Sequence, residues 1–315
     1  MTKVKLEKVV DIRLEPSQEV ADLVDKMYAA GGFMGRHLAE AGMIYRDMLE
    51  DKKCIKFLSF PAALIATGTR GVIVDMIKKD MVDVIITASG ALDHDLARSW
   101  GDYYHGSFDL DDVKLHRMGY HRLGNLLVPL DEYGPAIEKR LQPWLEELYS
   151  HGRRSLGTEE LCTLLGRLAD DEGSLLYWAQ KKGVPIFVPG PMDGAVGSQL
   201  WLFANKHSDF QIDVVRDEKR LADIVFDSKR AGALVMGGGI SKHHTLWWAQ
   251  FKGGLDYACY ITTATEYDGS LSGAQVKEAV SWGKVRERAK KTNLLADVTT
   301  VLPFIASYAL TRARR

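Results

Sequence analysis

The chain has 315 residues, of which 46% are hydrophobic and 26% charged, and its 41 lysines and arginines face 42 aspartates and glutamates, for a net charge of −1 at pH 7. This composition is typical of a globular protein that can bury a sizeable core. The balanced charge gives no electrostatic basis for binding nucleic acid or a membrane surface, so we expect neither partner.

The sequence shows no sign of secretion. Its first residues contain no apolar stretch as long as that of a signal peptide, and nowhere do about 18 uncharged apolar residues follow one another. Cys54, Cys162 and Cys259 are far apart and form no CxxC pair. We therefore expect a cytoplasmic protein without a transmembrane helix, whose thiols are reduced and mostly buried.

Residues 16–50 predict two helices. Pro16-Ser17 is a helix-start signal, the apolar residues between positions 20 and 27 recur with a helical period, and Gly31-Gly32 interrupts that pattern. We expect residues 1–50 to form an N-terminal helical extension of one larger domain at residues 51–315.

From Cys54 onward, apolar runs that resemble strands alternate with stretches that resemble helices. The expected strands are 54–60, 82–87, 184–189, 232–237, 256–262 and 293–297. The expected helices include 64–80, 135–150, 158–182, 216–230 and 273–282. Most strand runs are apolar nearly throughout, as in strands that are covered on both faces. The alternation predicts an α/β fold with a Rossmann-like, doubly wound, mostly parallel sheet and flanking helices.

Small and polar residues follow each expected strand. The turns are FPAALIATG (60–68), TASGALDHD (87–95), PGPMDGAVG (189–197), GGGISKHH (237–244), TTATEYDGSLSG (262–273) and ADVTT (296–300). In an open α/β sheet, ligands bind outside the carboxyl ends of the strands, and small residues let the backbone approach a ligand closely. The turns therefore predict a sizeable cleft. A nucleotide suits it, because helix N-termini can hold phosphate groups.

The turn at 237–244 permits three interpretations. Its glycines match neither the P-loop nor the GxGxxG fingerprint, and alone they fit a tight turn as well as a cofactor loop; the other five turns favour the cofactor loop. Lys242 is a candidate nucleophile. His243 and His244 are candidate metal ligands, but adjacent histidines at a helix start cannot both face one ion without distortion, and no HExxH or paired CxxC motif accompanies them. We expect no metal site, and favour a single histidine that acts as a base or hydrogen-bond partner.

A second dense motif is EAVSWGK at 278–284. Glu278 and Trp282 share one helix face, and Gly283 is a natural helix stop that leaves Lys284 beside a large apolar ring. An amine beside such a ring is partly desolvated and becomes a usable nucleophile. The spacing alone favours a simpler interpretation, in which an amphipathic helix ends with a lysine that reaches toward solvent.

Longer segments resemble one family. From about residue 54 to near the C-terminus the chain is similar, in the same order, to deoxyhypusine synthases, and most closely to the archaeal branch. The segments that carry the resemblance are DMVDVIITASG (80–90), RLGNLLVP (122–129), YWAQKKGVPIF (177–187), GGGISKHH (237–244), DYACYITTATEYDGSLSGA (256–274) and EAVSWGK (278–284).

The resemblance implies a reaction. Enzymes of this family use NAD to oxidise the carbon beside the secondary amine of spermidine, and an active-site lysine attacks the resulting imine and releases 1,3-diaminopropane. A specific lysine of the precursor of translation initiation factor 5A then takes over the aminobutyl group, and hydride returned from NADH gives deoxyhypusine. Members of the family are tetramers with active sites between paired subunits, so we expect a homotetramer.

The resemblance also implies roles for individual residues. Lys284 is the expected nucleophile, and His243 the expected proton acceptor and substrate contact. The implied substrate-binding residues are Glu278, Trp282, Gly269, Ser270 and Asp93. The implied NAD-binding residues, which would make residues 51–315 an NAD-binding catalytic domain, are Thr87, Ala88, Asp193, Gly238, Thr263, Ala264, Asp268 and Asp297.

Several positions depart from the eukaryotic pattern of the family. Leu271 and Ser198 stand where substrate-binding aspartates are expected, a TSN turn is replaced at 61–63, and a Glu-Glu pair is replaced by Asp93-His94. Glu266, Glu278 and Asp93 can still hold amines. The lost carboxylates motivate one alternative, a homospermidine-synthase-like transfer of the aminobutyl group to a small amine. Another alternative is a non-catalytic NAD-binding module, for which the turns at 87–90 and 237–239 would suffice.

Overall fold

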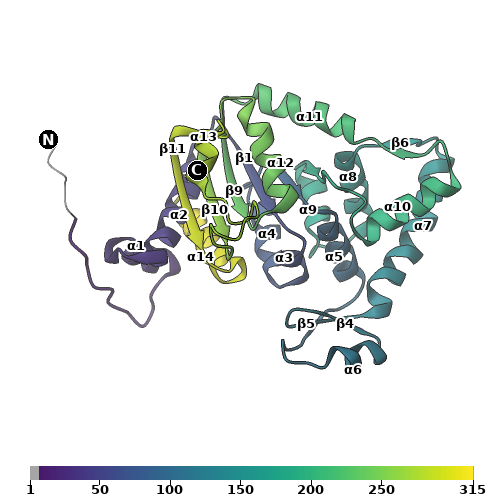
Figure 1. Ribbon diagram of the computed structural model, residues 1–315, viewed down its shortest axis with the longest axis horizontal. Helices are drawn as coiled ribbons and strands as arrows, with labels where there is room; N and C mark the ends of the chain where they lie inside the picture. The colour runs from purple at the N-terminus through teal and green to yellow at the C-terminus, as the bar shows by residue number, and fades with distance from the viewer. Residues whose placement is uncertain (1–6, 315) are drawn as a thin grey trace.

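Six strands form one parallel sheet at the centre of the molecule (Figure 1). In the computed structural model, which describes residues 7–314, their spatial order is β11-β10-β9-β1-β2-β7. Every ladder in this sheet is parallel. Counted along the chain the order is 3-2-1-4-5-6, which is that of Rossmann folds, so the predicted fold class is confirmed. The strands are β1 (Cys54–Phe60), β2 (Val84–Thr87), β7 (Ile186–Phe187), β9 (Arg230–Met236), β10 (Leu255–Thr262) and β11 (Val285–Leu295).

Helices cover both faces of this sheet, because successive side chains of a strand point to opposite sides. In β1, Leu58 belongs to the large core cluster and Phe57 to the smaller one. The smaller cluster lies beneath α11 (Val214–Asp227), α12 (Gly239–Gln250) and α13 (Val276–Ser281). Helices that contribute to the large cluster include α2 (Phe33–Glu50), α4 (Thr69–Lys78), α5 (Ser89–Trp100), α7 (Gly134–Ser150), α10 (Ala195–Lys206) and α14 (Val298–Arg312). No helix in the described part of the chain is long and apolar enough to cross a membrane.

The two N-terminal helices form as predicted. α1 (Val20–Ala30) and α2 are separated at Gly31 and Gly32, whose φ angles of +66° and +77° favour glycine. α2 packs into the same core as the sheet: the hydroxyl of Tyr45 donates to the carbonyl of Met81 at 2.8 Å. The domain boundary that we place at residue 50 stays a prediction.

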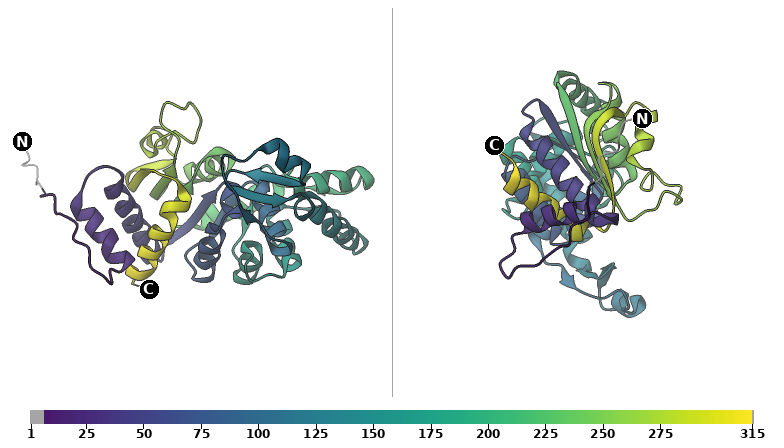
Figure 2. Two further views of the ribbon diagram at one scale, coloured as in Figure 1. Left: turned by 90° about the horizontal axis from the view of Figure 1, so that it is seen from below. Right: turned by 90° about the vertical axis from the view of Figure 1, so that its left-hand side faces the viewer.

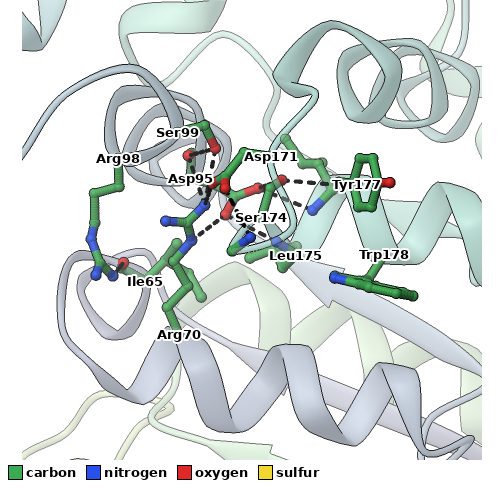
Figure 3. Close-up of polar contacts among 12 residues, drawn as sticks. Ile65, Arg70, Asp95, Arg98, Ser99, Asp171, Ser174, Leu175, Tyr177 and Trp178 are labelled. Atoms are coloured by element: carbon green, nitrogen blue, oxygen red, sulfur yellow. Dashed lines mark hydrogen bonds and ion pairs between the residues drawn. The ribbon is translucent and has the colours of Figure 1, made fainter.

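The expected helix at 158–182 is wrong, because the chain breaks it into α8 (Thr158–Ala169) and α9 (Leu175–Lys182). The reason is a buried carboxylate on α5, shown in Figure 3. Asp95 accepts hydrogen bonds from the Ser174 hydroxyl at 2.6 Å and from the first amides of α9, and it pairs with the Arg70 guanidinium at 2.7 Å. This carboxylate fixes where α9 starts.

Other boundaries also differ from the prediction. The expected helix at 64–80 divides at Thr67-Gly68 into α3 (Ala63–Ala66) and α4. The last strand was expected at 293–297, but β11 begins at Val285. β11 is the edge strand of the sheet, and its residues 286–288 and 290 are exposed and charged. The first part of β11 is therefore not an apolar run, and the sequence pattern did not predict it.

A small antiparallel sheet that the sequence did not reveal projects from the body (Figures 1 and 2). It consists of β3 (Tyr104–His105), β4 (Tyr120–Leu123) and β5 (Leu126–Pro129). Along the chain, the short helix α6 (Asp112–Arg117) connects β3 to β4. A short 3-10 helix, η1 (Leu130–Glu132), leads from it into α7. A further pair of strands, β6 (Ser155–Leu156) and β8 (Gln211–Ile212), lies apart from the main sheet.

Candidate active site

The strand order places a crevice between β1 and β9, because the connections from these neighbours run to opposite sides of the sheet. A cleft of about 570 Å³ opens at this point, and we call it the switch-point cleft. Five of the eight predicted NAD-binding residues line it, namely Gly238, Thr263, Ala264, Asp268 and Asp297. Pro61, Ala63 and Leu64 after β1 form the opposite wall.

Two helices begin at this cleft. α12 starts after Gly238 and α14 starts after Asp297, and no side chain caps either helix start among the described residues. Gly237 and Gly239 have φ angles of +69° and +68°, and a Cβ at Gly239 would meet only open space. Free amides at two helix N-termini attract anionic groups, so this wall fits the phosphates of a nucleotide.

Gly238 is required for a different reason. A Cβ at this position would clash with the side chain of Ser272, so the turn after β9 lies directly against the segment that follows β10. The glycines at 237–239 therefore form a tight turn, and the same turn lines the cleft, as expected of a cofactor loop.

The other three predicted NAD-binding residues lie beyond β1 on the same edge of the sheet, outside this cleft. Thr87 is fully buried and its hydroxyl donates to the Phe60 carbonyl at 2.8 Å. Ala88 is the residue before α5. Asp193 is exposed in the turn before α10.

Asp93 lies beneath that turn. Its carboxylate accepts from the amides of Ala195 at 2.7 Å and Val196 at 2.8 Å and from the Tyr133 hydroxyl at 2.9 Å, and it is fully buried. Burial raises the pKa of Asp93, and the two amide hydrogen bonds oppose that shift. The structure thus shows Asp93 supporting the start of α10, and its carboxylate lines neither the switch-point cleft nor the pocket described next.

A smaller pocket of about 260 Å³ collects the predicted catalytic residues, and we call it the lysine pocket. α12 supplies His243 and α13 supplies Glu278. Trp282 caps the end of α13, and Lys284 follows after Gly283. Gly283, with φ +67°, ends the helix, and the amide of Lys284 donates to the carbonyl of Ala279 at 2.9 Å. The motif at 278–284 is therefore a helix end that turns its lysine into a pocket.

Aromatic rings surround the Lys284 amine. Its Nζ lies 5.2 Å from the centre of the Trp282 ring and 5.8 Å from that of Trp247. His243 stacks on Trp247, with ring centres 5.7 Å apart. Trp282 is 66% exposed and Trp247 44% exposed, so one side of the pocket is open in a single chain.

The two adjacent histidines diverge. His243 is exposed at the lysine pocket, whereas His244 lies outside it and its Nε2 is 3.3 Å from Glu218 Oε1. Burial lowers the pKa of His244, and the Glu218 carboxylate opposes that shift.

Two more residues of the lysine pocket are buried: Lys242, which the sequence made a candidate nucleophile, and Tyr260, to which it gave no role. Lys242 is 1% exposed and donates to the carbonyls of Leu271 at 2.7 Å and Ala274 at 2.8 Å. Tyr260 on β10 is also buried, and its hydroxyl has no hydrogen-bond partner among the described residues. Tyr260 falls inside the predicted strand 256–262, so only the packing of α12 against β10 could reveal it.

The remaining predicted residues lie around these pockets. Ser270 lines the switch-point cleft, and Gly269 lies at the exposed tip of the segment after β10. Glu266 lines a third pocket of about 520 Å³ beside α2. Leu271 lines the lysine pocket, and Ser198 is exposed on α10, where its hydroxyl donates to the Gly194 carbonyl at 3.0 Å.

The strand order, the cleft at the switch point and the adjoining lysine pocket define a Rossmann-like α/β protein with a candidate active site. Comparison with known proteins gives the family. The profile of deoxyhypusine synthases matches residues 22–309, and the chain belongs to that family. The homology supports an enzyme, and specifically a transferase.

The most similar relatives include two archaeal proteins described as "Probable deoxyhypusine synthase". The protein from Thermoplasma volcanium is 51% identical over 298 residues, which cover 94% of this chain and 95% of the relative. The protein from Picrophilus torridus is 48% identical over 301 residues, which cover 96% of each chain. The crystal structure of "a putative deoxyhypusine synthase" from Entamoeba histolytica is 18% identical, matches with a TM-score of 0.66 over 98% of both chains, and shows the likeness of fold.

Proposed function

We propose that this protein transfers the aminobutyl group of spermidine, with NAD as cofactor, to a specific lysine of the translation initiation factor 5A precursor and so forms deoxyhypusine. One observation carries the proposal: Lys284, His243, Glu278 and Trp282 come together in one pocket beside a cleft suited to a dinucleotide. Membership of the family supports the same reaction.

The switch-point cleft fits NAD. The amides at the starts of α12 and α14 would hold its phosphates, and Asp268 and Asp297 would accept hydrogen bonds from ribose hydroxyls. The chemistry that bound NAD supplies is reversible hydride acceptance, which converts the secondary amine of spermidine to an imine and later reduces the product imine.

The lysine pocket supplies the covalent chemistry. The neutral Lys284 amine attacks the imine carbon of the oxidised spermidine, the carbon–nitrogen bond to 1,3-diaminopropane breaks, and the aminobutyl group stays on Lys284 as an imine. The acceptor lysine then attacks the same carbon and releases Lys284 with its amine restored. His243 takes up and returns the protons of these exchanges, and the Glu278 carboxylate holds an ammonium group of the substrate.

The open side of the lysine pocket supports the rest of the proposal. Exposed Trp247 and Trp282 would be covered by a second subunit in a homotetramer whose active sites lie between paired subunits. We further propose that the protein acts in the cytoplasm, where its protein substrate is made.

The decisive experiment traps the imine on Lys284. After incubation with NAD and spermidine, borohydride reduction should leave an aminobutyl group on Lys284, located by peptide mass spectrometry. Lys284→Ala should carry no adduct, and the control Lys277→Ala, which changes an exposed lysine of α13, should retain it. An adduct that persists in Lys284→Ala, or its absence from the native protein, would rule the proposal out.

A second candidate function is transfer of the aminobutyl group to a small amine. It is favoured by Leu271, which puts an apolar side chain where the eukaryotic pattern of the family has a carboxylate. Among the described residues, this leaves Glu278 as the one carboxylate that lines the lysine pocket. Adding putrescine or the factor precursor to the unreduced Lys284 imine, and only afterwards borohydride, separates the two functions. Faster release of the adduct to the precursor supports the first function, and faster release to putrescine supports the second.

A further inference from the structure

Lys242 is a fully buried cation for which the proposed reaction has no use. It lies at the wall of the lysine pocket, yet it is only 1% exposed, and no carboxylate pairs with it among the described residues. Burying an ammonium group is costly unless hydrogen bonds replace its water shell. The contacts of the Lys242 ammonium should therefore show which groups replace its water shell.

The ammonium holds the segment between β10 and α13. Its Nζ donates to the carbonyls of Leu271 and Ala274, which are 29 and 32 residues further along the chain, and it lies 4.4 Å from the centre of the Tyr260 ring. Hydrogen bonds from a charged donor are stronger than those between neutral groups, and the ring face adds a cation–π attraction.

This segment, residues 263–275, has no helix or strand of its own. Its tip projects from the body as the yellow-green loop of Figure 2, and Tyr267 there is 89% exposed. Its base is held closely: a Cβ at Gly273 would clash with the carbonyl of Thr265, and Ser272 lies against Gly238. The Lys242 ammonium is the charged group that joins this base to α12.

The segment forms walls of both pockets. Thr263, Ala264, Asp268, Ser270 and Ser272 face the switch-point cleft, whereas Leu271, Ala274 and Gln275 face the lysine pocket. α12 also reaches both, since its start lines the cleft and Lys242 and His243 line the pocket. A displacement of the segment from α12 would therefore change both pockets together.

We propose that Lys242 is a positioning residue, whose buried ammonium binds segment 263–275 to α12. This contact keeps the switch-point cleft and the lysine pocket in a fixed position relative to each other. The part of this inference that concerns NAD and amine binding rests on the proposed function. The part that concerns the order of the segment does not.

The two lysines of the pocket therefore have different tasks. The Lys242 amine is engaged by two backbone carbonyls, whereas the Lys284 amine contacts only aromatic rings among the described residues. An amine must be neutral to attack a substrate carbon, and two carbonyl acceptors favour the protonated ammonium form of Lys242, which has no lone pair. This difference in hydrogen bonding explains why Lys284, and not Lys242, is available as the nucleophile.

Hydrogen exchange of the whole protein tests the inference. Lys242→Met keeps the length and much of the volume of the side chain but removes the charge. We expect amides of residues 268–275 to exchange about tenfold faster or more in this variant, while β1 and β9 keep their protection. The control is Lys252→Met, since Lys252 also donates to a backbone carbonyl but lies just beyond the C-terminal end of α12. Unchanged exchange in Lys242→Met would overturn the inference.

Chemical rescue separates the charge from the packing. Lys242→Ala with added propylammonium should recover slow exchange of the segment, or recover folding if the variant is unstable, and propanol of similar size should not. Equal rescue by the alcohol would overturn the inference, because the ammonium would then not be needed. Exchange is the readout here, since an added amine could also act as an acceptor of the aminobutyl group.

NAD binding links the inference to the proposed function. Lys242→Met should bind NAD about tenfold more weakly or worse, as measured by calorimetry, and should also form less adduct on Lys284. Lys284→Ala should lose the adduct yet keep native exchange of the segment. If the native protein forms no adduct while Lys242→Met exchanges faster, the proposed function fails and the positioning role stands.

Discussion

Two regions of the molecule use charged side chains in opposite ways. On α5, Asp95 is buried and has the guanidinium of Arg70, a hydroxyl and two amides as partners. In the lysine pocket, Lys284 is partly exposed and its amine contacts two aromatic rings. A charge whose partners are all internal contributes to stability, whereas a charge with few partners is free to react. Substitutions in the two regions should therefore have separate consequences.

The largest effect should follow Lys284→Ala. We expect kcat/KM for deoxyhypusine formation to fall about ten-thousandfold or more, because the proposed covalent step loses its nucleophile. The free energy of unfolding should hardly change, since the side chain is partly exposed and makes no hydrogen bond among the described residues. Steady-state kinetics and urea unfolding measure the two quantities, and a large loss of stability would contradict the comparison.

Asp95→Asn should do the reverse. The substitution removes one of the two carboxylates that pair with the buried Arg70 guanidinium, the other being Asp171 at 3.0 Å, and it weakens the hydrogen bonds at the start of α9. We expect unfolding in urea to become easier by about 2–3 kcal/mol. Asp112→Asn is the control, since Asp112 pairs with Arg122 at the exposed surface, and it should leave the unfolding midpoint unchanged. An equal effect of both substitutions would show that burial does not distinguish these ion pairs.

The strands were predictable because parallel strands covered on both faces are continuous apolar runs. All six predicted strands occur in the main sheet, and their carboxyl ends lie at the edge where the turns predicted a cleft. The break between α8 and α9 was harder to foresee. Gly173 and Ser174 mark it locally, but what fixes the start of α9 is Asp95, about 80 residues earlier.

The candidate site shows the same division between local and distant contacts. The motif at 278–284 carries its geometry within one helix end, so the sequence could place Glu278, Trp282 and Lys284 together. Lys242 and Tyr260 meet only when α12 packs against β10, and no local pattern predicts that contact. Asp93 illustrates the opposite case, because a family resemblance identifies the position but not the hydrogen bonds that occupy its carboxylate.

A smaller effect should appear as a pH dependence of stability. Burial lowers the pKa of His94 to about 4, while in the unfolded chain it is about 6.5. As the pH falls from 6.5 to 4, the unfolded state therefore binds a proton that the folded state does not, and stability is lost over this window. Because the ring is partly exposed, we expect a loss of about 2 kcal/mol from this residue.

His94→Asn isolates that contribution. The difference in unfolding free energy between pH 7 and pH 4 should be about 2 kcal/mol smaller in the variant than in the native protein. Carboxylates titrate in both proteins, so their contribution cancels in the comparison. An identical pH dependence would mean that His94 is protonated equally in the folded and unfolded states.

The smallest expected effect is that of Asp93→Asn, and it tests whether Asp93 has a structural role or binds substrate. Asp93 was expected to bind substrate, yet its carboxylate is buried and bonded to the amides of Ala195 and Val196. If it supports the start of α10, Asp93→Asn should lower the unfolding free energy by about 1–2 kcal/mol and leave the KM for spermidine unchanged. If it holds a substrate amine, the KM should rise with little change in stability. Glu278→Gln is the reference for the second outcome, because Glu278 lines the lysine pocket and is exposed. An equal rise of the KM for spermidine in Asp93→Asn and Glu278→Gln would show that Asp93 does bind substrate. Part of the substrate site would then lie beneath the turn that contains Asp193.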